Sequence, residues 1–244
     1  MLRYVLGLIA VSGVAAFAAL PAADTIPASG GDIKIQPINH ATLQITHGSH
    51  VIDVDPVAAA GDYSGFAAPD IILITDIHGD HMDPATVAKL KGATTKIVTP
   101  AAVAAQGKFE GAIVIANGET KTVDGVSIEA VPMYNLVRGP AAGKLFHDKG
   151  RGNGYILTLG GKRIYLAGDT ECIPEMKALK NIDVAFIPMN LPYTMTPAEA
   201  AECVKSFKPK IAYPYHYQGQ KPEEFAEALK GSGVDVRLRD WYAK

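Results

Sequence analysis

The segment that follows the apolar run Ile71–Ile74 carries a dense group of side chains able to bind metal. Four potential ligands lie within six residues: Asp76, His78, Asp80 and His81. The run before them has no alternation and is rich in β-branched residues, which predicts a short buried strand. Asp83-Pro84 then predicts a helix start, with Asp as N-cap. Unpaired charges beside a core strand are costly, so we favour a metal or catalytic loop over a solvated polar loop.

Three further ligand-type residues stand in comparable places. Asp169 follows a predicted strand within Gly168-Asp169-Thr170, His216 follows the predicted strand Ile211–Tyr215, and His147 lies in a long loop. Strand ends can converge even when they are far apart in sequence. A divalent ion takes three or four nitrogen and oxygen ligands plus an open position for water. The supply suffices for two ions about 3.5 to 4 Å apart.

The elements that must position these residues are strand hairpins alternating with helices in both halves of the chain. Hairpin turns are predicted at Gly48-Ser49, Asp124-Gly125 and Gly160-Gly161. The predicted strands are 33–38, 41–46, 50–55, 71–74, 96–99, 113–116, 121–123, 126–132, 155–159, 163–167, 184–188, 211–215 and 234–238, and the predicted helices are 84–90, 101–105, 174–179, 197–207 and 222–230. This order predicts two similar α/β halves packed sheet on sheet, with the helices outside.

The segment Met133–Asn153 has no periodicity. A loop of about twenty residues inside a compact domain is uncommon and is usually functional or disordered. Its polar content favours function, and it includes Tyr134, Asn135, Arg138, Lys144, His147, Lys149 and Arg151. We expect this loop to line a pocket, with Arg138, Lys144 and Arg151 giving a weak indication of an anionic substrate.

The composition is that of one globular domain. The chain has 244 residues, of which 48% are hydrophobic and 20% charged, enough for one domain of about 200 to 250 residues. The formal net charge is −2 and no basic run appears, so nothing predicts binding to nucleic acid. The partner that we expect is a small-molecule substrate, and the sequence predicts no oligomeric state.

Residues 1–23 resemble a secretory signal peptide. Arg3 precedes the apolar segment Val5–Leu20, and small residues follow it, which predicts cleavage between Ala18 and Ala23. A retained membrane anchor is the alternative, although the segment is short for a spanning helix. We expect a periplasmic or secreted protein whose domain covers residues 24–244, with no stable membrane association after cleavage.

Two cysteines, Cys172 and Cys203, could pair in an oxidising compartment. Their spacing fits no metal motif. We favour two buried free thiols over a disulfide. Asp53 is expected to face solvent on the side of its strand opposite Asp55.

Taken together, these motifs resemble the metallo-β-lactamase fold family of metal-dependent hydrolases, in particular its simple single-domain members. That family has a His-x-His-x-Asp-His loop, a later His, an Asp in Gly-Asp-Thr and a final His. Here the loop is Asp76-Ile-His78-Gly-Asp80-His81, and the other motifs are Gly168-Asp169-Thr170 and His216. The match covers essentially the whole chain after the leader. It implies an α/β fold, a four-layer αββα sandwich of two mixed sheets with outer helices.

The resemblance also implies roles for individual residues. His78 and His147 would hold a first metal ion, Asp80, His81 and His216 a second, and Asp169 would bridge the two. His40 and Asp55 would lie behind or beside the ions and orient ligands or substrate, although His40 could equally be a hydrogen-bonded core histidine. Tyr134, Asn135 and Arg151 are expected around the same site.

Asp76 departs from the family pattern, because it stands where the family has its first His. If Asp76 is a ligand, the site has three carboxylates, Asp76, Asp80 and Asp169, and more oxygen ligands than the family pattern supplies. We expect two divalent ions, zinc first, with manganese or iron as alternatives that a richer oxygen supply would favour. If Asp76 is not a ligand, the first site is empty or weak.

We therefore expect an exported metal-dependent hydrolase, in which a hydroxide held by the metals attacks an ester, lactone, amide or phosphodiester. Asp80 or Asp169 would take up the proton during turnover. Two alternatives from the same family remain open, a mononuclear iron oxygenase of sulfur compounds and a metal-binding module without activity. Fold alone does not decide between them.

Overall fold

The first half of the chain forms one mixed sheet in the computed structural model, which describes residues 21–242. Its strands lie in sequence order: β1 (Asp24–Ile26), β2 (Ile33–Asn39), β3 (Thr42–His47), β4 (His50–Val54), β5 (Ile71–Leu73), β6 (Lys96–Thr99) and β7 (Ile113–Val114). β1 to β4 pair antiparallel, and β4 to β7 run parallel. The parallel strands therefore bring their carboxyl ends to one common edge of the sheet.

The second half repeats this plan. Its strands are β8 (Thr120–Val123), β9 (Val126–Met133), β10 (Gly152–Leu159), β11 (Lys162–Leu166), β12 (Val184–Pro188), β13 (Ile211–Tyr215) and β14 (Asp235–Val236). β8 to β11 pair antiparallel and β11 to β14 run parallel. The prediction of two similar halves is confirmed.

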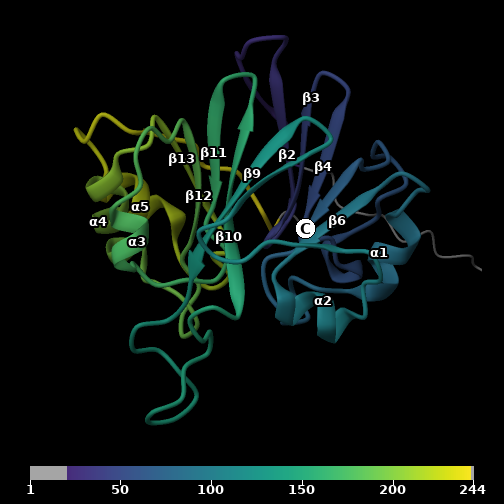
Figure 1. The fold of residues 1–244 in the computed structure, drawn as a ribbon. Helices are drawn as coiled ribbons and strands as arrows, with labels where there is room; N and C mark the ends of the chain where they lie inside the picture. Colours follow the sequence, from purple (N-terminus) through teal and green to yellow (C-terminus); the bar gives the residue numbers. More distant parts are fainter. Residues whose placement is uncertain (1–20, 243–244) are drawn as a thin grey trace, which may run out of the picture.

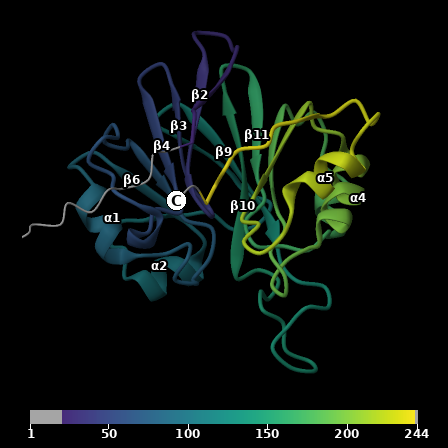
Figure 2. The same cartoon turned by 180° about the vertical axis from the view of Figure 1, so that it is seen from behind.

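The two sheets face each other, and the helices cover their outer faces (Figures 1 and 2). α1 (Pro84–Leu90) and α2 (Ala101–Gly107) lie outside the first sheet, and α3 (Pro174–Lys177), α4 (Pro197–Phe207) and α5 (Pro222–Ala228) lie outside the second. A short 3-10 helix spans Ala58–Ala60. This arrangement is the αββα sandwich that the family resemblance implies. Within residues 21–242, no helix is both long and apolar enough to cross a membrane.

β5 shows why the strand before the polar loop is continuously apolar. Ile71 and Leu73 belong to the large core between the sheets, whereas Ile72 and Ile74 pack in a smaller core that includes Val87 of α1. Both faces of the strand are buried, so alternation between apolar and polar residues is lost. The loop after β5 is thus anchored on two sides.

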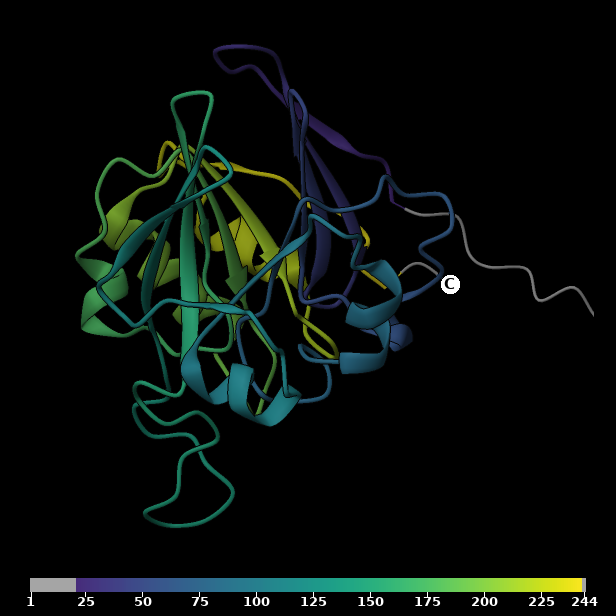
Figure 3. The same ribbon diagram turned by 45° about the vertical axis from the view of Figure 1, so that its right-hand side comes forward.

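Most predicted elements lie within one or two residues of the observed ones, and the predicted cap at Asp83 is present. Asp83 accepts hydrogen bonds from the backbone N–H groups of Ala85 and Thr86. Thr196 forms a capping box with Glu199 at the start of α4. One strand was not predicted: β1, which pairs with β2. β10 begins at Gly152, so the long loop is residues 134–151, which extend beyond the sheets (Figure 3).

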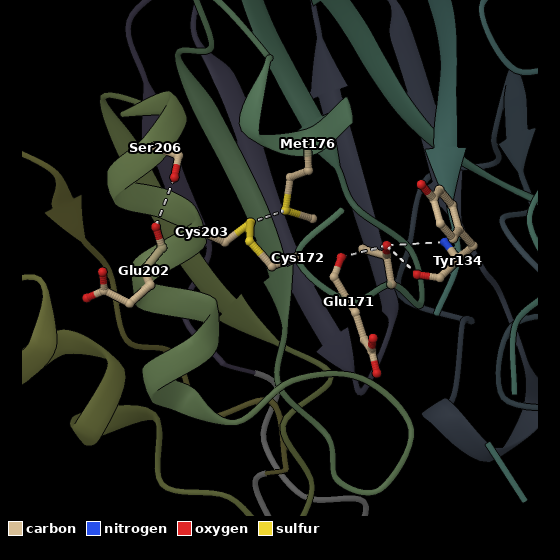
Figure 4. Close-up of a disulfide and its surroundings, with 8 residues drawn as sticks. Tyr134, Glu171, Cys172, Met176, Glu202, Cys203 and Ser206 are labelled. Atoms are coloured by element: carbon tan, nitrogen blue, oxygen red, sulfur yellow. Dashed lines mark hydrogen bonds between the residues drawn. A yellow bond between two sulfur atoms is a disulfide. The ribbon is translucent and has the colours of Figure 1, made fainter. Parts of the chain in front are cut away.

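Two expectations about single residues were wrong. Cys172 and Cys203 form a disulfide with a Cα–Cα distance of 5.6 Å, which ties the segment after Asp169 to α4 (Figure 4). Asp53 does not face solvent, because it is 2% exposed and accepts a hydrogen bond from Gln44. Gln44 also donates to the carbonyl of Ala67, so the segment after β4 covers this face of the strand. The predicted leader, residues 1–23, lies almost wholly outside the described part of the chain.

Candidate metal centre

The polar residues that follow four strands meet at one edge of the sandwich. Asp55 follows β4, the Asp76–His81 loop follows β5, Asp169 follows β11 and His216 follows β13. Asp55 and His216 have left-handed backbone conformations, with φ of 45° and 48°. Such conformations are strained for residues other than glycine and concentrate at functional sites. They turn the chain sharply as soon as each strand ends.

Four of the predicted ligands form one group, which we call the four-ligand cluster: Asp80, His81, Asp169 and His216. One ligand atom from each lies within 4.8 Å of the others. His216 Nε2 is 3.2 Å from Asp169 Oδ1 and 3.4 Å from Asp80 Oδ2. His81 Nε2 is 3.3 Å from Asp169 Oδ2. Two carboxylates and two imidazoles therefore converge on one small volume.

The other three predicted ligands form a neighbouring three-ligand cluster: Asp76, His78 and His147. His78 Nδ1 lies 3.0 Å from Asp76 Oδ2, and His147 Nε2 lies 4.0 Å from the same oxygen. His147 Nε2 is also 3.2 Å from Asp169 Oδ2. Asp169 thus stands between the two clusters, the place that the family resemblance implies for a bridging residue.

Buried polar atoms without partners show that the site suits a cation. Five atoms at this edge are buried and accept or donate no hydrogen bond within residues 21–242: His81 Nε2, His147 Nε2, Asp169 Oδ1, and both Nδ1 and Nε2 of His216. Leaving such groups unpaired is costly. Imidazole nitrogens and carboxylate oxygens are ligands of zinc and of other divalent transition metals. The residues present therefore fit a metal ion.

In each cluster, a hydrogen bond at the Nδ1 atom holds one imidazole ring in its orientation. In the four-ligand cluster, His81 Nδ1 donates to Asp55 Oδ2 at 2.8 Å, and Asp55 also accepts from the backbone and hydroxyl of Thr75. In the three-ligand cluster, His147 Nδ1 donates to Asn135 Oδ1 at 2.6 Å. Each bond places the ring proton on Nδ1, which leaves the Nε2 lone pair free to bind a metal.

His40 supports the four-ligand cluster from the pocket side. Its Nε2 donates to Asp80 Oδ2 at 3.2 Å, and its Nδ1 accepts from the hydroxyl of Tyr242. The backbone N–H of Gln218 donates to that hydroxyl in turn. Burial lowers the pKa of His40, so the ring is neutral at pH 7. This series of contacts orients Asp80. Tyr242 belongs to no motif in the sequence and reaches the site only through the fold.

The electrostatics of the four-ligand cluster favour bound positive charge. Burial alone would raise the pKa of Asp169, but the imidazoles of His216 and His81 hold it well below its usual range. Burial would also raise the pKa of Asp80, and its contacts with His216 and His40 lower it instead. The pKa of His81 is raised well above its usual value by Asp169 and Asp55, against the effect of burial. Both carboxylates are thus ionised and attract a cation.

Arg151 contacts Asp76 with both arms of its guanidinium. Nε lies 3.0 Å from Asp76 Oδ1, and Nη2 lies 2.8 Å from Asp76 Oδ2. The Asp76 side chain is fully buried. Planar, two-bonded pairs of this kind are among the strongest that a carboxylate makes. Arg151 is therefore at the site, as expected. It contacts the candidate ligand Asp76 and does not line the pocket.

Two loop residues do not reach the site. The hydroxyl of Tyr134 donates to Glu175 Oε2 at 2.9 Å, away from both clusters. Arg138 pairs with Glu171 and Glu199, so its charge is compensated outside the pocket. Glu171 had not been singled out, yet it also accepts from the backbone N–H groups of Leu136 and Val137 and so holds the start of the loop.

A pocket of about 680 Å³ opens over the two clusters. It contains four of the predicted residues, His78, Asp80, His147 and Asp169, together with His40. The remaining lining was not predicted and comes from separate segments of the chain: Asn39, Val57, Ala59, Ala60, Phe146, Asn190, Tyr193, Gln218 and Tyr242. No Lys or Arg side chain of the described chain lines the pocket. The indication of an anionic substrate therefore finds no support in the pocket lining.

Comparison with known proteins agrees with this geometry. A family model described as a β-lactamase superfamily domain matches residues 34–216, three quarters of the chain. The chain belongs to the metallo-β-lactamase superfamily. The match begins in β2 and ends at His216, so it includes every predicted ligand.

Individual relatives extend over nearly the whole domain. A UPF0173 metal-dependent hydrolase of Pyrococcus abyssi is 34% identical over 224 residues, which cover 85% of this chain and 96% of the relative. A protein of Parabacteroides distasonis whose crystal structure is known is 45% identical in sequence. Its structure superimposes with a TM-score of 0.84, and the match covers 90% of this chain and 99% of that one. Igni18, a metallo hydrolase from Ignicoccus hospitalis, shares the fold at 24% identity and a TM-score of 0.70, covering 84% and 94%.

Proposed function

We propose that this protein is a metal-dependent hydrolase whose catalytic ion is held by Asp80, His81, Asp169 and His216. The observation that carries the proposal is the convergence of buried, unpartnered nitrogen and oxygen atoms at the floor of the pocket. The names of relatives such as the Pyrococcus abyssi protein support the same activity. Zinc is the first candidate for the ion, with manganese and iron as alternatives because two of the four ligands are carboxylates.

A divalent ion in this position supplies two things, a lowered pKa for a coordinated water and polarisation of the substrate oxygen. The chain's own residues supply the rest. Asp55 fixes the ring of His81, and His40 fixes Asp80 Oδ2, so the ligands are oriented before an ion binds. The side chain of Asp80 is 45% exposed and lines the pocket, so its carboxylate is accessible to take up a proton during turnover.

The lining supports an uncharged substrate with an apolar or aromatic group. Phe146 and Tyr193 pack edge to face with ring centroids 4.9 Å apart on one wall, and Val57, Ala59 and Ala60 contribute apolar surface. The absence of Lys and Arg from the described lining gives the charge of a phosphate group no lysine or arginine partner there. We therefore place a carbonyl ester, lactone or amide ahead of a phosphodiester.

The experiment is a substrate screen on metal-loaded and metal-stripped protein. Chromogenic esters and lactones with apolar acyl groups should be hydrolysed with a kcat/KM at least about 10-fold above that for a chromogenic phosphodiester, a difference of about 1.4 kcal/mol in transition-state binding. Activity should vanish on chelation and return with the ion. A phosphodiester preferred over every carbonyl substrate would contradict the substrate class, and equal rates with and without metal would contradict the activity.

We also propose that the protein is exported. The apolar segment Val5–Leu20 and the small residues after it support a cleaved leader. The disulfide between Cys172 and Cys203 supports an oxidising compartment, since such bonds are rare in reducing cytosol. Mass spectrometry of the protein from its native host should find a new N-terminus between Ala18 and Ala23. An intact Met1 on protein from the cytoplasmic fraction would contradict export.

A further inference from the structure

The three-ligand cluster differs from the four-ligand cluster in having an arginine, Arg151, paired with its carboxylate. We propose that the guanidinium of Arg151 takes the place of the second metal ion, so that the chain holds one ion tightly, on the four-ligand cluster. The proposal rests on the proposed function, because it assumes that the four-ligand cluster binds an ion. It argues against the two ions that the sequence led us to expect.

The geometry of Asp76 is the first argument. Both of its oxygens are engaged by Arg151, at 3.0 Å and 2.8 Å, and Oδ2 is also 3.0 Å from His78 Nδ1. A metal ion at Asp76 would therefore have to compete with Arg151 and His78 for the carboxylate oxygens. In the four-ligand cluster, by contrast, Asp169 Oδ1 makes no hydrogen bond to any residue within 21–242.

Charge is the second argument. The four-ligand cluster offers two carboxylates, Asp80 and Asp169, and their charged partners in the described chain are histidines, with no Lys or Arg among them. The three-ligand cluster offers Asp76 alone, and Arg151 cancels that charge. An ion bound to Asp76 Oδ2 at about 2 Å would lie within about 5 Å of a fixed guanidinium. Because Asp169 is shared, an ion on the four-ligand cluster already draws on its charge.

Asp76 stands outside the family pattern, and Arg151 compensates the charge that this departure brings. A neutral His in the first position of the loop would need no guanidinium beside it. A buried Asp there needs a cation, and Arg151 at the end of the long loop provides one. The pair is neutral, so it replaces the neutral imidazole without adding net charge. Unlike an imidazole, however, the Asp76–Arg151 pair offers no free nitrogen lone pair for a metal ion to bind.

One consequence concerns the two remaining histidines. His78 and His147 both line the pocket, and His147 Nε2 is buried without a hydrogen-bond partner in the described structure. In a one-ion site the two rings hold no metal ion and remain part of the pocket wall that a substrate would contact. The three-ligand cluster thereby becomes part of the substrate-binding surface.

The test is a zinc titration of the apo protein by calorimetry, followed by elemental analysis after dialysis at buffered free zinc. Wild type should bind one Zn²⁺ per chain, with at least about 100-fold higher affinity than any second ion, a gap of about 2.7 kcal/mol. Arg151→Gln should gain a second tight ion, because Asp76 then lacks a cation. The double variant Asp76→His with Arg151→Gln should gain one too, and it leaves no unpaired buried charge if the single variant fails to fold.

Arg138→Gln is the matched control. Arg138 is an arginine of the same loop whose partners, Glu171 and Glu199, lie away from the ligands, so this variant should stay at one ion. Two ions of similar affinity in wild type would overturn the proposal and leave the proposed function standing. So would a double variant that folds and still binds one ion. A folded wild-type chain that binds no zinc, manganese or iron would overturn both.

Discussion

The two ligand clusters are neighbours at the same edge of the sandwich, yet they answer the same electrostatic problem in different ways. The four-ligand cluster collects Asp80 and Asp169 with two imidazoles and contains no Lys or Arg. The three-ligand cluster collects Asp76 with two imidazoles and adds the guanidinium of Arg151. The first has no permanent cation among its residues, and a metal ion bound from outside the chain would compensate its two carboxylates. The second is neutralised from within.

The size of the effect shows why this difference matters. At an effective dielectric constant of about 20, a divalent ion about 5 Å from a guanidinium is repelled by about 7 kcal/mol. That repulsion offsets much of the attraction that a single carboxylate offers. The number of ligand-type residues in a cluster is therefore a poor guide to metal affinity unless every charge near them is counted.

The largest expected effect comes from removing a ligand of the four-ligand cluster. His216→Ala should abolish tight metal binding and reduce hydrolysis by more than about 100-fold, beyond the range typical of residues behind the ligands. The fold should survive, because His216 follows β13 and its side chain faces the site and not the sheet core. Elemental analysis and circular dichroism measure both. Full metal content in a folded variant would remove His216 from the centre.

A matched pair of substitutions behind the ligands compares the clusters directly. Asp55→Asn weakens the bond that orients His81, and Asn135→Ala removes the bond that orients His147. Asp55→Asn should lower zinc affinity about 10- to 100-fold, the usual effect of a lost partner behind a ligand. Asn135→Ala should leave zinc affinity within about 2-fold if only the four-ligand cluster holds a tight ion.

Calorimetric titration of the two variants in parallel gives the answer, with thermal unfolding of the apo forms as the control for folding. Equal losses of affinity in both variants would mean that the two clusters bind ions alike. That result would count against the distinction drawn between them.

The smallest expected effect involves a buried carboxylate outside both clusters. Asp53 is paired with the amide of Gln44 and has no cation in contact, and burial raises its pKa to about 6. Because the folded state then favours the protonated form, the contribution of Asp53 to stability is fully present below about pH 4. It is lost as the pH rises through about 6, with a total of about 2 to 3 kcal/mol.

Asp53→Asn should therefore stabilise the protein by about 1 to 2 kcal/mol at pH 8 and have little effect at pH 4. Urea unfolding of the metal-free protein at the two pH values measures the difference. A variant that is equally or less stable at pH 8 would show that Asp53 stays ionised at little cost. In that case a buried carboxylate of this protein could be ionised without a cation beside it.

Much of this molecule could be predicted from local patterns. The apolar run before Asp76, the capped helices and the turn signals indicated the order of elements, and the motifs around His78, Asp169 and His216 indicated the candidate ligands and the family. These features depend on residues close together in the chain. Side-chain period, N-cap chemistry and turn geometry act within a few residues, so the sequence alone specifies them.

Only the tertiary structure showed which distant groups support each cluster and which charge compensates Asp76. Arg151 meets Asp76 across 75 residues, Asp55 meets His81 across 26, and Cys172 meets Cys203 across 31. β1 became a strand because the edge of β2 was available, and Asp53 became buried because a later segment covers it. These outcomes depend on which distant groups packing brings together, and burial then sets how strongly their charges interact.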